Sequence, residues 1–310
     1  FCSRFTHILI LKRIEINIEI SSKCNMDCVM CPQGTMTRPK VNMEVELFQK
    51  IIDEVRESTE LVLLHLSGEP LLHPRLSEIL AICAERQIPP LLSTNAGILD
   101  ERRSRILLEQ PPTILIMSMD GLSKETYEQI RRRGKFEVTR QNIQAFLALK
   151  KEGGYTAPHT VVQLIYMQQN AAEARAFHDQ WKRSSADEVR IKPYCNYPAI
   201  EEHHGTHQPR NRQGLKPCFY LWRQMAVTAD GTVVPCCLDM TAELPIGQAR
   251  TENLHDIWNG APMQRLRQLH AEGRYDEVSP CNTCSMPQVS NATMWASALL
   301  HAATVKRLLP

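Results

Sequence analysis

Short apolar runs alternate with amphipathic stretches along residues 14–193. Six runs rich in β-branched and aliphatic residues predict strands at 14–20, 61–66, 90–94, 113–118, 160–167 and 188–193. Between them, apolar residues recur every three to four positions, as amphipathic helices require, in the sets Leu47, Phe48, Ile51, Ile52, Val55 and Leu76, Ile79, Leu80, Cys83. Strands that alternate with helices predict a parallel sheet with right-handed crossovers. A closed eight-unit barrel takes about 250 residues, so we expect an α/β fold with an open, partial (β/α)6 TIM-like barrel.

The pattern changes after Pro193. Residues 196–217 combine prolines and histidines without periodicity, which predicts a linker or lid. Residues 225–237 predict a hairpin that turns at Asp230-Gly231, and two helical segments follow it. We therefore expect a partial barrel at 1–200, a linker at 201–217, a small α+β domain at 218–285 and a packing helix at 286–310.

Composition and charge narrow the possible partners. The chain has 310 residues, a formal net charge of +2 and a mean hydropathy of -0.30, which is typical of a globular protein. Because positive charge is not in excess, we expect neither nucleic acid nor a membrane as a partner. The apolar runs are far shorter than the about 20 residues of a membrane helix, and the N-terminal segment has no signal-peptide pattern. We therefore expect a cytoplasmic protein.

The candidate chemistry lies in the 11 cysteines of the chain. Cysteines at short spacings in a reducing compartment are more often metal ligands than disulfides. Cys24, Cys28 and Cys31 follow the first strand with spacings of three and two residues. Soft thiolates suit an iron–sulfur cluster, and three of them leave one iron of a four-iron cluster open for another ligand. A three-cysteine zinc site and unliganded thiols are the alternatives.

This three-cysteine spacing resembles the signature of the radical S-adenosylmethionine (radical SAM) enzymes. The resemblance implies that Cys24, Cys28 and Cys31 hold a [4Fe-4S] cluster whose open iron binds SAM. It extends to SGEP (67–70), which implies a contact with the SAM amino group, and to STN (93–95) and SMDG (118–121), which imply contacts with its ribose and carboxylate.

The segment 130–136 resembles a stretch whose first arginine, here Arg131, faces the SAM carboxylate. Met30 stands where the family often has an aromatic residue against adenine, and a methionine makes a softer version of that contact. Each short motif alone could also be an ordinary turn or a helix cap. The SAM contacts implied by the resemblance are Met30, Gly68, Glu69, Pro70, Ser93, Asn95, Ser118, Asp120 and Arg131.

A second set of cysteines resembles the one-cluster SPASM/twitch extension of some radical SAM enzymes. Its spacing is similar to that of the aminocyclitol dehydrogenase of the butirosin pathway, and the resemblance extends to related aminoglycoside and sugar epimerases. Four thiolates would saturate an auxiliary [4Fe-4S] cluster, which then suits electron transfer; a structural zinc site is the alternative. The implied ligands are Cys218, Cys236, Cys281 and Cys284.

Four cysteines remain, of which Cys83 is predicted to lie in the core. Cys2 lies near the chain end, whereas Cys195 and Cys237 are candidate catalytic residues that could donate a hydrogen atom. His65 and His73 flank the SGEP motif as candidate supporting groups. The histidines at 203, 204 and 207 are expected in an exposed polar loop.

The resemblance implies that a 5′-deoxyadenosyl radical takes a hydrogen atom from a hydroxylated small molecule, a sugar or aminocyclitol. Return of a hydrogen by Cys195 or Cys237 would give epimerisation, which we favour, and loss of an electron to the auxiliary cluster would give dehydrogenation to a ketone. We expect a flavodoxin- or ferredoxin-type electron donor. Peptide modification is a further alternative, although only 23 residues precede Cys24, which favours a small substrate. A non-catalytic iron–sulfur or zinc protein is the alternative from another class.

Overall fold

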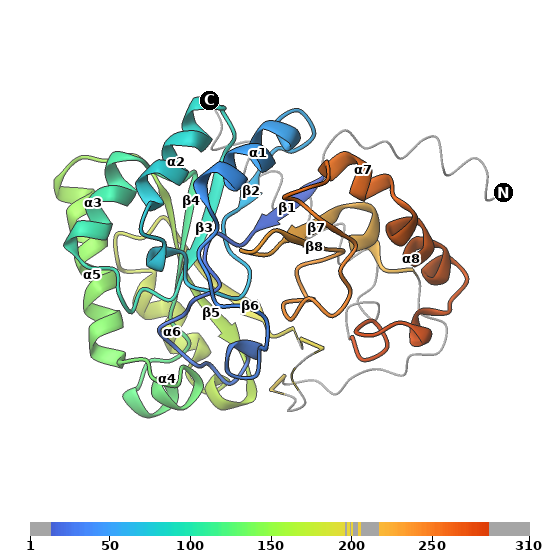
Figure 1. Cartoon of the computed structure of the whole chain (residues 1–310). Helices are drawn as coiled ribbons and strands as arrows, with labels where there is room; N and C mark the ends of the chain where they lie inside the picture. The colour runs from blue at the N-terminus through green and yellow to red at the C-terminus, as the bar shows by residue number, and fades with distance from the viewer. Residues whose placement is uncertain (1–13, 196, 199, 201–203, 206–216, 285–310) are drawn as a thin grey trace.

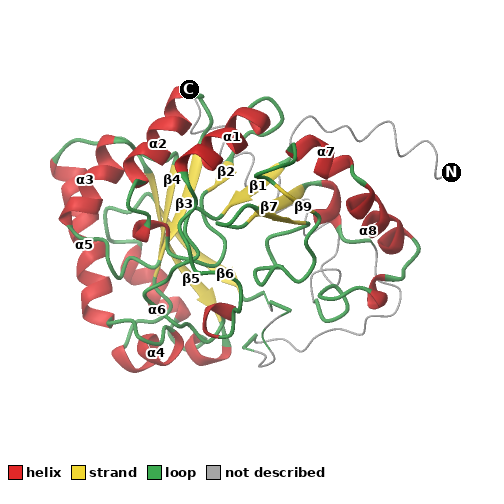
Figure 2. Cartoon of the chain, in the orientation of Figure 1, coloured by secondary structure: helices red, strands yellow, loops and turns green. Residues whose placement is uncertain are grey.

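The computed structural model describes residues 14–195, 197–198, 200, 204–205 and 217–284. Parallel strands with helices on their outer side form a partial barrel, and the C-terminal segment lies beside it (Figures 1 and 2). The strands are β1 Glu15–Ile18, β2 Val62–Leu63, β3 Pro90–Thr94, β4 Ile114–Ser118, β5 His159–Tyr166, β6 Glu188–Pro193, β7 Gln224–Val227, β8 Thr232–Val234 and β9 Gly247–Gln248. The α-helices are α1 Val45–Val55, α2 Leu76–Glu85, α3 Glu101–Glu109, α4 Lys124–Ile130, α5 Phe136–Glu152, α6 Ala174–Trp181, α7 Leu254–Asn259 and α8 Ala261–Ala271, and the 3-10 helices are η1 Pro32–Gly34, η2 Pro70–Leu72, η3 Gln168–Asn170, η4 Phe219–Trp222 and η5 Tyr275–Glu277.

One sheet runs through the described residues in the order β6-β5-β4-β3-β2-β1-β7-β8-β9. Strands β1 to β6 pair in parallel with their neighbours, as the alternation of strands and helices predicts. The expected partial barrel is confirmed. Since parallel strands run in one direction, all their carboxyl ends meet at one rim of the barrel, where ligands bind in such folds.

The C-terminal segment continues this sheet. The predicted hairpin forms from β7 and β8, which pair antiparallel. Gly231 in its turn has a φ of +93°, a conformation that favours glycine. β7 also pairs in parallel with β1, where Ile16 lies opposite Met225, so the first barrel strand joins the two regions directly.

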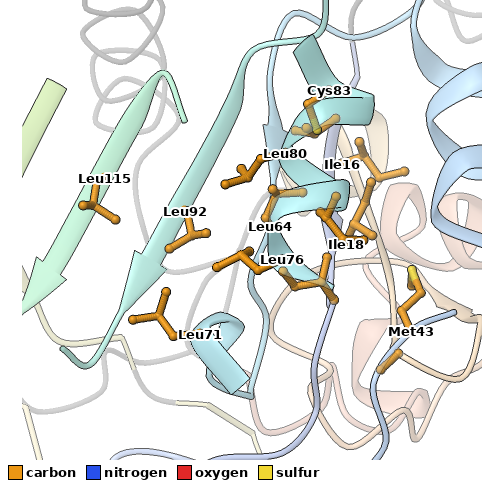
Figure 3. Packing of buried hydrophobic residues seen from close by; sticks show 14 of the residues in the cluster. Ile16, Ile18, Met43, Leu64, Leu71, Leu76, Leu80, Cys83, Leu92 and Leu115 are labelled. Carbon is orange, nitrogen blue, oxygen red and sulfur yellow. The ribbon is translucent and has the colours of Figure 1, made fainter. Parts of the chain in front are cut away.

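The main core fills the space between the strands and the helices outside them. In α2, Leu76, Leu80 and Cys83 pack toward Ile16 and Leu64 of the neighbouring strands (Figure 3). Cys83 has no solvent exposure, so its predicted place in the core is confirmed. A smaller apolar cluster of Leu61, Leu63, Leu91, Ile114, Ile116 and Val161 lines the opposite face of the sheet, which is the barrel lumen.

Several expectations fall outside the described residues, namely the packing helix at 286–310, Cys2 and most of the linker at 201–217. One histidine of that linker is described, and the expectation that it is exposed is wrong. His204 is 2% exposed, and its Nδ1 lies 2.8 Å from Gln169 Nε2, because the end of the barrel at η3 folds against it. Among the described residues, no helix is both long enough and apolar enough to cross a membrane.

Candidate active site

The loop after β1 brings Cys24, Cys28 and Cys31 together at the carboxyl rim of the barrel. Within the loop, Cys31 N donates to Cys28 O at 3.0 Å, which forms a tight turn. The loop is anchored on the segment after α4, because Asp27 N and Val29 N donate to backbone carbonyls there, both at 3.0 Å. A local turn held by the barrel therefore presents the three sulfur atoms.

The chemistry of these thiols fits an iron–sulfur cluster. Burial raises the pKa of Cys28 to about 11 and that of Cys31 to about 12, and their cysteine neighbours raise these pKa values further. Burial also raises the pKa of Cys24. Metal ligation needs the thiolate form, so three neighbouring thiolates here call for a bound positive charge. In the described part of the chain, no three His, Cys, Asp or Glu side chains are arranged to hold a single metal ion.

The SGEP motif packs against this loop through its glycine. A Cβ on Gly68 would lie 1.8 Å from the backbone oxygen of Ser21, so only glycine fits. Glu69 N donates to Lys23 O at 2.8 Å, and Gln33 Nε2 donates to the backbone oxygens of Ser22 and Ser67 at 2.6 and 3.1 Å. Motif and loop thus form one unit, with Pro70 buried as the first residue of η2.

The Glu69 carboxylate connects the ends of β2 and β3. It is 1% exposed and accepts hydrogen bonds from Leu71 N, Thr94 Oγ1 and Asn95 N at 3.0, 2.8 and 2.8 Å. Burial raises its pKa. Asn95 extends this arrangement to the cysteine loop, because its Nδ2 lies 3.8 Å from Cys24 Sγ.

At the end of β4, Asp120 forms a buried ion pair with Arg131. The guanidinium donates to Asp120 Oδ2 from Nε at 2.8 Å and from Nη2 at 2.7 Å. Burial acts to lower the pKa of Arg131, but the Asp120 carboxylate and Cys28 outweigh burial and raise it. Arg131 therefore stays charged beside the cysteine loop, with Nη1 outside this ion pair.

The remaining predicted SAM contacts lie on the same rim. Ser93 of β3 is half-buried and Ser118 of β4 is 7% exposed. Met30 packs with Ile130, Met167 and Cys28 in a small apolar cluster. The N-cap of α4 is Ser123, whose side chain accepts from Thr126 N, so Ser118 and Asp120 do not cap that helix.

The second set of cysteines is brought together from three separate segments. Cys218 precedes η4, Cys236 follows β8, and Cys281 and Cys284 follow η5. Burial raises the pKa of Cys218 to about 12, with Cys284 and Cys281 as further causes. Burial, Cys237, Cys218 and Cys284 raise the pKa of Cys236. Four sulfur donors in electrostatic contact fit an auxiliary cluster.

Two further thiols are Cys195, two residues after the end of β6, and Cys237, which follows β8, and we call them the seam thiols. They interact electrostatically with each other, and burial raises the pKa of Cys195 to about 12. The neighbouring Tyr197 is a residue that the sequence patterns did not single out. Burial raises its pKa, and so do Cys195, Cys237 and Cys31. Tyr197 and Cys237 also pack against the same buried cluster, which includes Leu66 directly before the SGEP motif.

A buried polar network at the rim also escaped sequence reasoning. Glu19 has no solvent exposure and accepts hydrogen bonds from Arg38, Ser67 and Ala229. These residues come from the position directly after β1, the cysteine loop, the SGEP motif and the β7–β8 turn. The sequence held one signal of this network, namely that Glu19 is a charged residue at the end of an apolar strand. His73 has a structural role instead, with its Nε2 2.9 Å from the backbone oxygen of Met43.

Comparison with known families matches both regions of the chain. Residues 18–175 match the profile of the radical SAM superfamily, and residues 218–285 match SPASM, an iron–sulfur cluster-binding domain. The chain is 21% identical over 279 residues to the S-adenosyl-L-methionine-dependent 2-deoxy-scyllo-inosamine dehydrogenase of Niallia circulans, with 87% of this chain and 92% of the relative covered. It is 27% identical over 157 residues to a tungsten-containing aldehyde ferredoxin oxidoreductase cofactor-modifying protein of Pyrococcus furiosus, covering 49% of this chain and 44% of that relative.

Solved structures share the fold at low sequence identity. BtrN in complex with AdoMet and 2-DOIA is 19% identical, with a TM-score of 0.58 and coverage of 88% of this chain and 92% of BtrN. Streptococcus suis SuiB is 14% identical, with a TM-score of 0.67 and coverage of 88% and 71%. At this identity the likeness shows the fold alone. With the two profile matches lying on the two cysteine sets, the chain belongs to the radical SAM superfamily: it is an enzyme that uses SAM and a [4Fe-4S] cluster and carries an auxiliary iron–sulfur cluster in its SPASM region.

Proposed function

We propose that this enzyme epimerises a carbon atom of a hydroxylated small molecule, a sugar or aminocyclitol. The observation that carries the proposal is that Tyr197 and Cys237 pack against one buried cluster, which includes Leu66 directly before the SGEP motif, with Cys195 in electrostatic interaction with both. A hydrogen-atom donor has to be a protonated thiol close to the substrate. Burial keeps Cys195 in that form at neutral pH.

The assignment of residues to cofactors is part of this proposal. Cys24, Cys28 and Cys31 hold the SAM-binding cluster, and SAM is contacted by Met30, Gly68, Glu69, Pro70, Ser93, Asn95, Ser118, Asp120 and Arg131. The auxiliary cluster is held by Cys218, Cys236, Cys281 and Cys284. We further propose a barrel at 1–200, a linker at 201–217, the SPASM region at 218–285 and a packing segment at 286–310.

When bound, SAM and its cluster supply a 5′-deoxyadenosyl radical that removes a substrate hydrogen atom, and the auxiliary cluster supplies a one-electron donor or acceptor. The chain's own residues would hold the substrate with its reacting carbon within reach of a seam thiol. One seam thiol gives its hydrogen atom to the opposite face of that carbon, which breaks an S–H bond and forms a C–H bond. An electron from a flavodoxin- or ferredoxin-type donor and a proton from water then restore the thiol.

The test is a reaction in deuterated water with anaerobically reconstituted enzyme, SAM and a reductant. The probes are 2-deoxy-scyllo-inosamine and a panel of sugars and cyclitols, and the products are analysed by mass and configuration. Epimerisation gives one carbon-bound deuterium at an unchanged oxidation level, together with 5′-deoxyadenosine. A product two mass units lighter with no carbon-bound deuterium would refute it.

Variants then identify the donor. We expect one of the two variants, Cys195→Ala or Cys237→Ala, to lack the hydrogen-atom donor. That variant should still form 5′-deoxyadenosine but no inverted product. Cys83→Ala is the matched control, because Cys83 is buried in the core of the barrel wall. Full epimerisation by both seam variants would exclude thiol donation.

Dehydrogenation of a secondary alcohol to a ketone is the second candidate. It is favoured by the dehydrogenase of Niallia circulans, which aligns with 87% of this chain and 92% of its own length. The substrate would then lose a hydrogen atom, a proton and an electron, and the lighter product described above would support this reading.

A further inference from the structure

Two polar side chains in the barrel lumen take no part in the site described above. Asn17 of β1 pairs in register with Leu63 of β2, and Leu63 packs in the lumen cluster with Leu91. Residues in register on neighbouring strands point to the same face of a sheet, so Asn17 faces the lumen. His65 follows Leu63 by two positions, and the chain is still in the ladder at Leu64, whose N donates to Leu91 O at 2.8 Å. His65 therefore faces the lumen as well.

Both side chains carry a buried polar atom without a partner. Asn17 is 3% exposed, and its Nδ2 has no hydrogen-bond partner within the described ranges. The buried Nδ1 of His65 also has no hydrogen-bond partner among the residues that the structure describes. Leaving a buried polar group unpaired is unfavourable, and nearly all such groups in proteins are paired. Two of them on neighbouring strands of one wall point to a ligand that supplies the missing partners.

The opposite wall of the lumen carries Lys192 of β6. Glu188 pairs in register with Val161 of the lumen cluster, and Lys192 follows Glu188 by four positions, so its exposed side chain lies on the same face. Since β3, β4 and β5 separate β2 from β6 in the sheet, the electrostatic interaction of His65 with Lys192 runs across the lumen. Burial, and after it Lys192, lowers the pKa of His65 to about 4, so its ring is neutral at neutral pH. Lys192 also acts on Cys195 and Cys237, which places this wall next to the seam thiols.

We propose that Asn17, His65 and Lys192 bind the substrate, and that the substrate is a polyhydroxylated ring, a sugar or cyclitol. This inference rests on the proposed function and names the residues that recognise its substrate. A ring hydroxyl both donates and accepts hydrogen bonds, so it satisfies the Asn17 N–H and either tautomer of the neutral His65 ring. The Lys192 ammonium donates to a hydroxyl on the other edge of the ring. An apolar ring would leave these groups unpaired, and sites built for hydroxyl groups reject such ligands strongly.

The test measures binding to the anaerobically reconstituted holoenzyme with SAM by isothermal titration calorimetry. The probes are 2-deoxy-scyllo-inosamine, myo-inositol and glucose, with cyclohexylamine as the ring that lacks hydroxyls. The variants are Asn17→Leu, His65→Phe and Lys192→Met, and His255→Phe is the matched control, because the His255 side chain is 81% exposed. At least one polyol should bind the wild type, and each lumen variant should weaken that binding at least tenfold, whereas the control and the affinity for SAM stay unchanged.

Thermal unfolding without the probe separates recognition from a structural role. Asn17→Leu and His65→Phe remove unpaired polar atoms, so neither should lower the thermal midpoint. The inference is overturned if no polyol binds the wild type, if cyclohexylamine binds equally well, if the lumen variants bind as the wild type does, or if lost binding accompanies a lowered midpoint. Polyol binding without any inverted product would refute the proposed function alone, and inversion at unchanged affinity in the lumen variants would refute this inference alone.

Discussion

Replacing Arg38 by methionine should destabilise this fold far more than replacing an arginine of an exposed ion pair. The Arg38 guanidinium donates to both oxygens of Glu19, at 2.7 and 2.5 Å. The side chains are 7% and 0% exposed. The same carboxylate accepts from Ser67 Oγ at 2.5 Å and from Ala229 N at 3.0 Å, so it is fixed in place when Arg38→Met removes the charge that neutralises it.

The expected loss of stability follows from the burial of the Arg38–Glu19 ion pair. Removing one partner of a buried ion pair costs about 3–5 kcal/mol, since the other charge stays behind without compensation. Arg38 Nε also donates to Met240 O at 2.7 Å, a bond whose loss adds about 1 kcal/mol. Arg105→Met is the matched control. It removes an ion pair with Glu101 whose side chains are 56% and 68% exposed, and solvent screens such exposed pairs, so they add little to stability.

Denaturant unfolding followed by circular dichroism measures these differences, with all variants compared at equal iron content because bound clusters stabilise the fold. Arg38→Met should lower the free energy of unfolding by at least about 3 kcal/mol, and Arg105→Met should leave it nearly unchanged. The double variant Glu19→Leu, Arg38→Met buries no charge and should recover most of the loss. The reasoning would be refuted if Arg38→Met and Arg105→Met lowered the free energy of unfolding equally, or if the double variant were less stable than Arg38→Met.

Three further predictions concern the rim and the lumen. Gly68→Ala places a methyl group 1.8 Å from a backbone oxygen, whereas in Gly34→Ala the closest atom belongs to a movable side chain; iron analysis should show loss in the first variant and retention in the second. Cys24→Ala should lose about four iron atoms per chain and all SAM cleavage, and unchanged iron would contradict this; Cys83→Ala should keep both. Burial lowers the pKa of His65 to about 4, so its contribution to stability is complete above the unfolded value of about 6.5 and is lost as the pH falls toward 4. His65→Phe should therefore flatten the decline of the free energy of unfolding between pH 6.5 and pH 4, measured by denaturant unfolding at each pH. If the free energies of the wild type and the variant fall in parallel with pH, the prediction is wrong.

The barrel strands could be predicted from sequence because each is a short buried apolar run. β3 and β6 coincide with the predicted ranges 90–94 and 188–193. β2 is shorter than predicted, Val62–Leu63 instead of 61–66. The chain leaves the ladder after Leu64, and the amide of Ser67 then donates to the Glu19 side chain. Apolarity predicts that a segment is buried, but not which groups accept its hydrogen bonds.

Contacts between distant segments could not be predicted in the same way. Arg38 bonds to Met240 across 202 positions of the chain, and β7 pairs with β1. Tyr197 lies in a segment without periodicity. Periodicity reports which face of its own element a residue occupies, whereas these contacts depend on how two elements approach each other.

The two cysteine sets show why one part of the site is encoded locally and the other is not. The first set lies within one loop that the barrel already anchors, so its spacing suffices to identify it. The second set comes from three segments, and its position depends on the pairing of β7 with β1 and on α8, where His270 Nδ1 lies 3.4 Å from Cys218 N. If these four cysteines hold the auxiliary cluster, as proposed, we expect cluster binding and folding of the C-terminal region to be coupled. The seam thiols depend on both regions, because Cys195 follows β6 and Cys237 follows Cys236, so the proposed hydrogen-atom donation needs the C-terminal region in place beside the barrel.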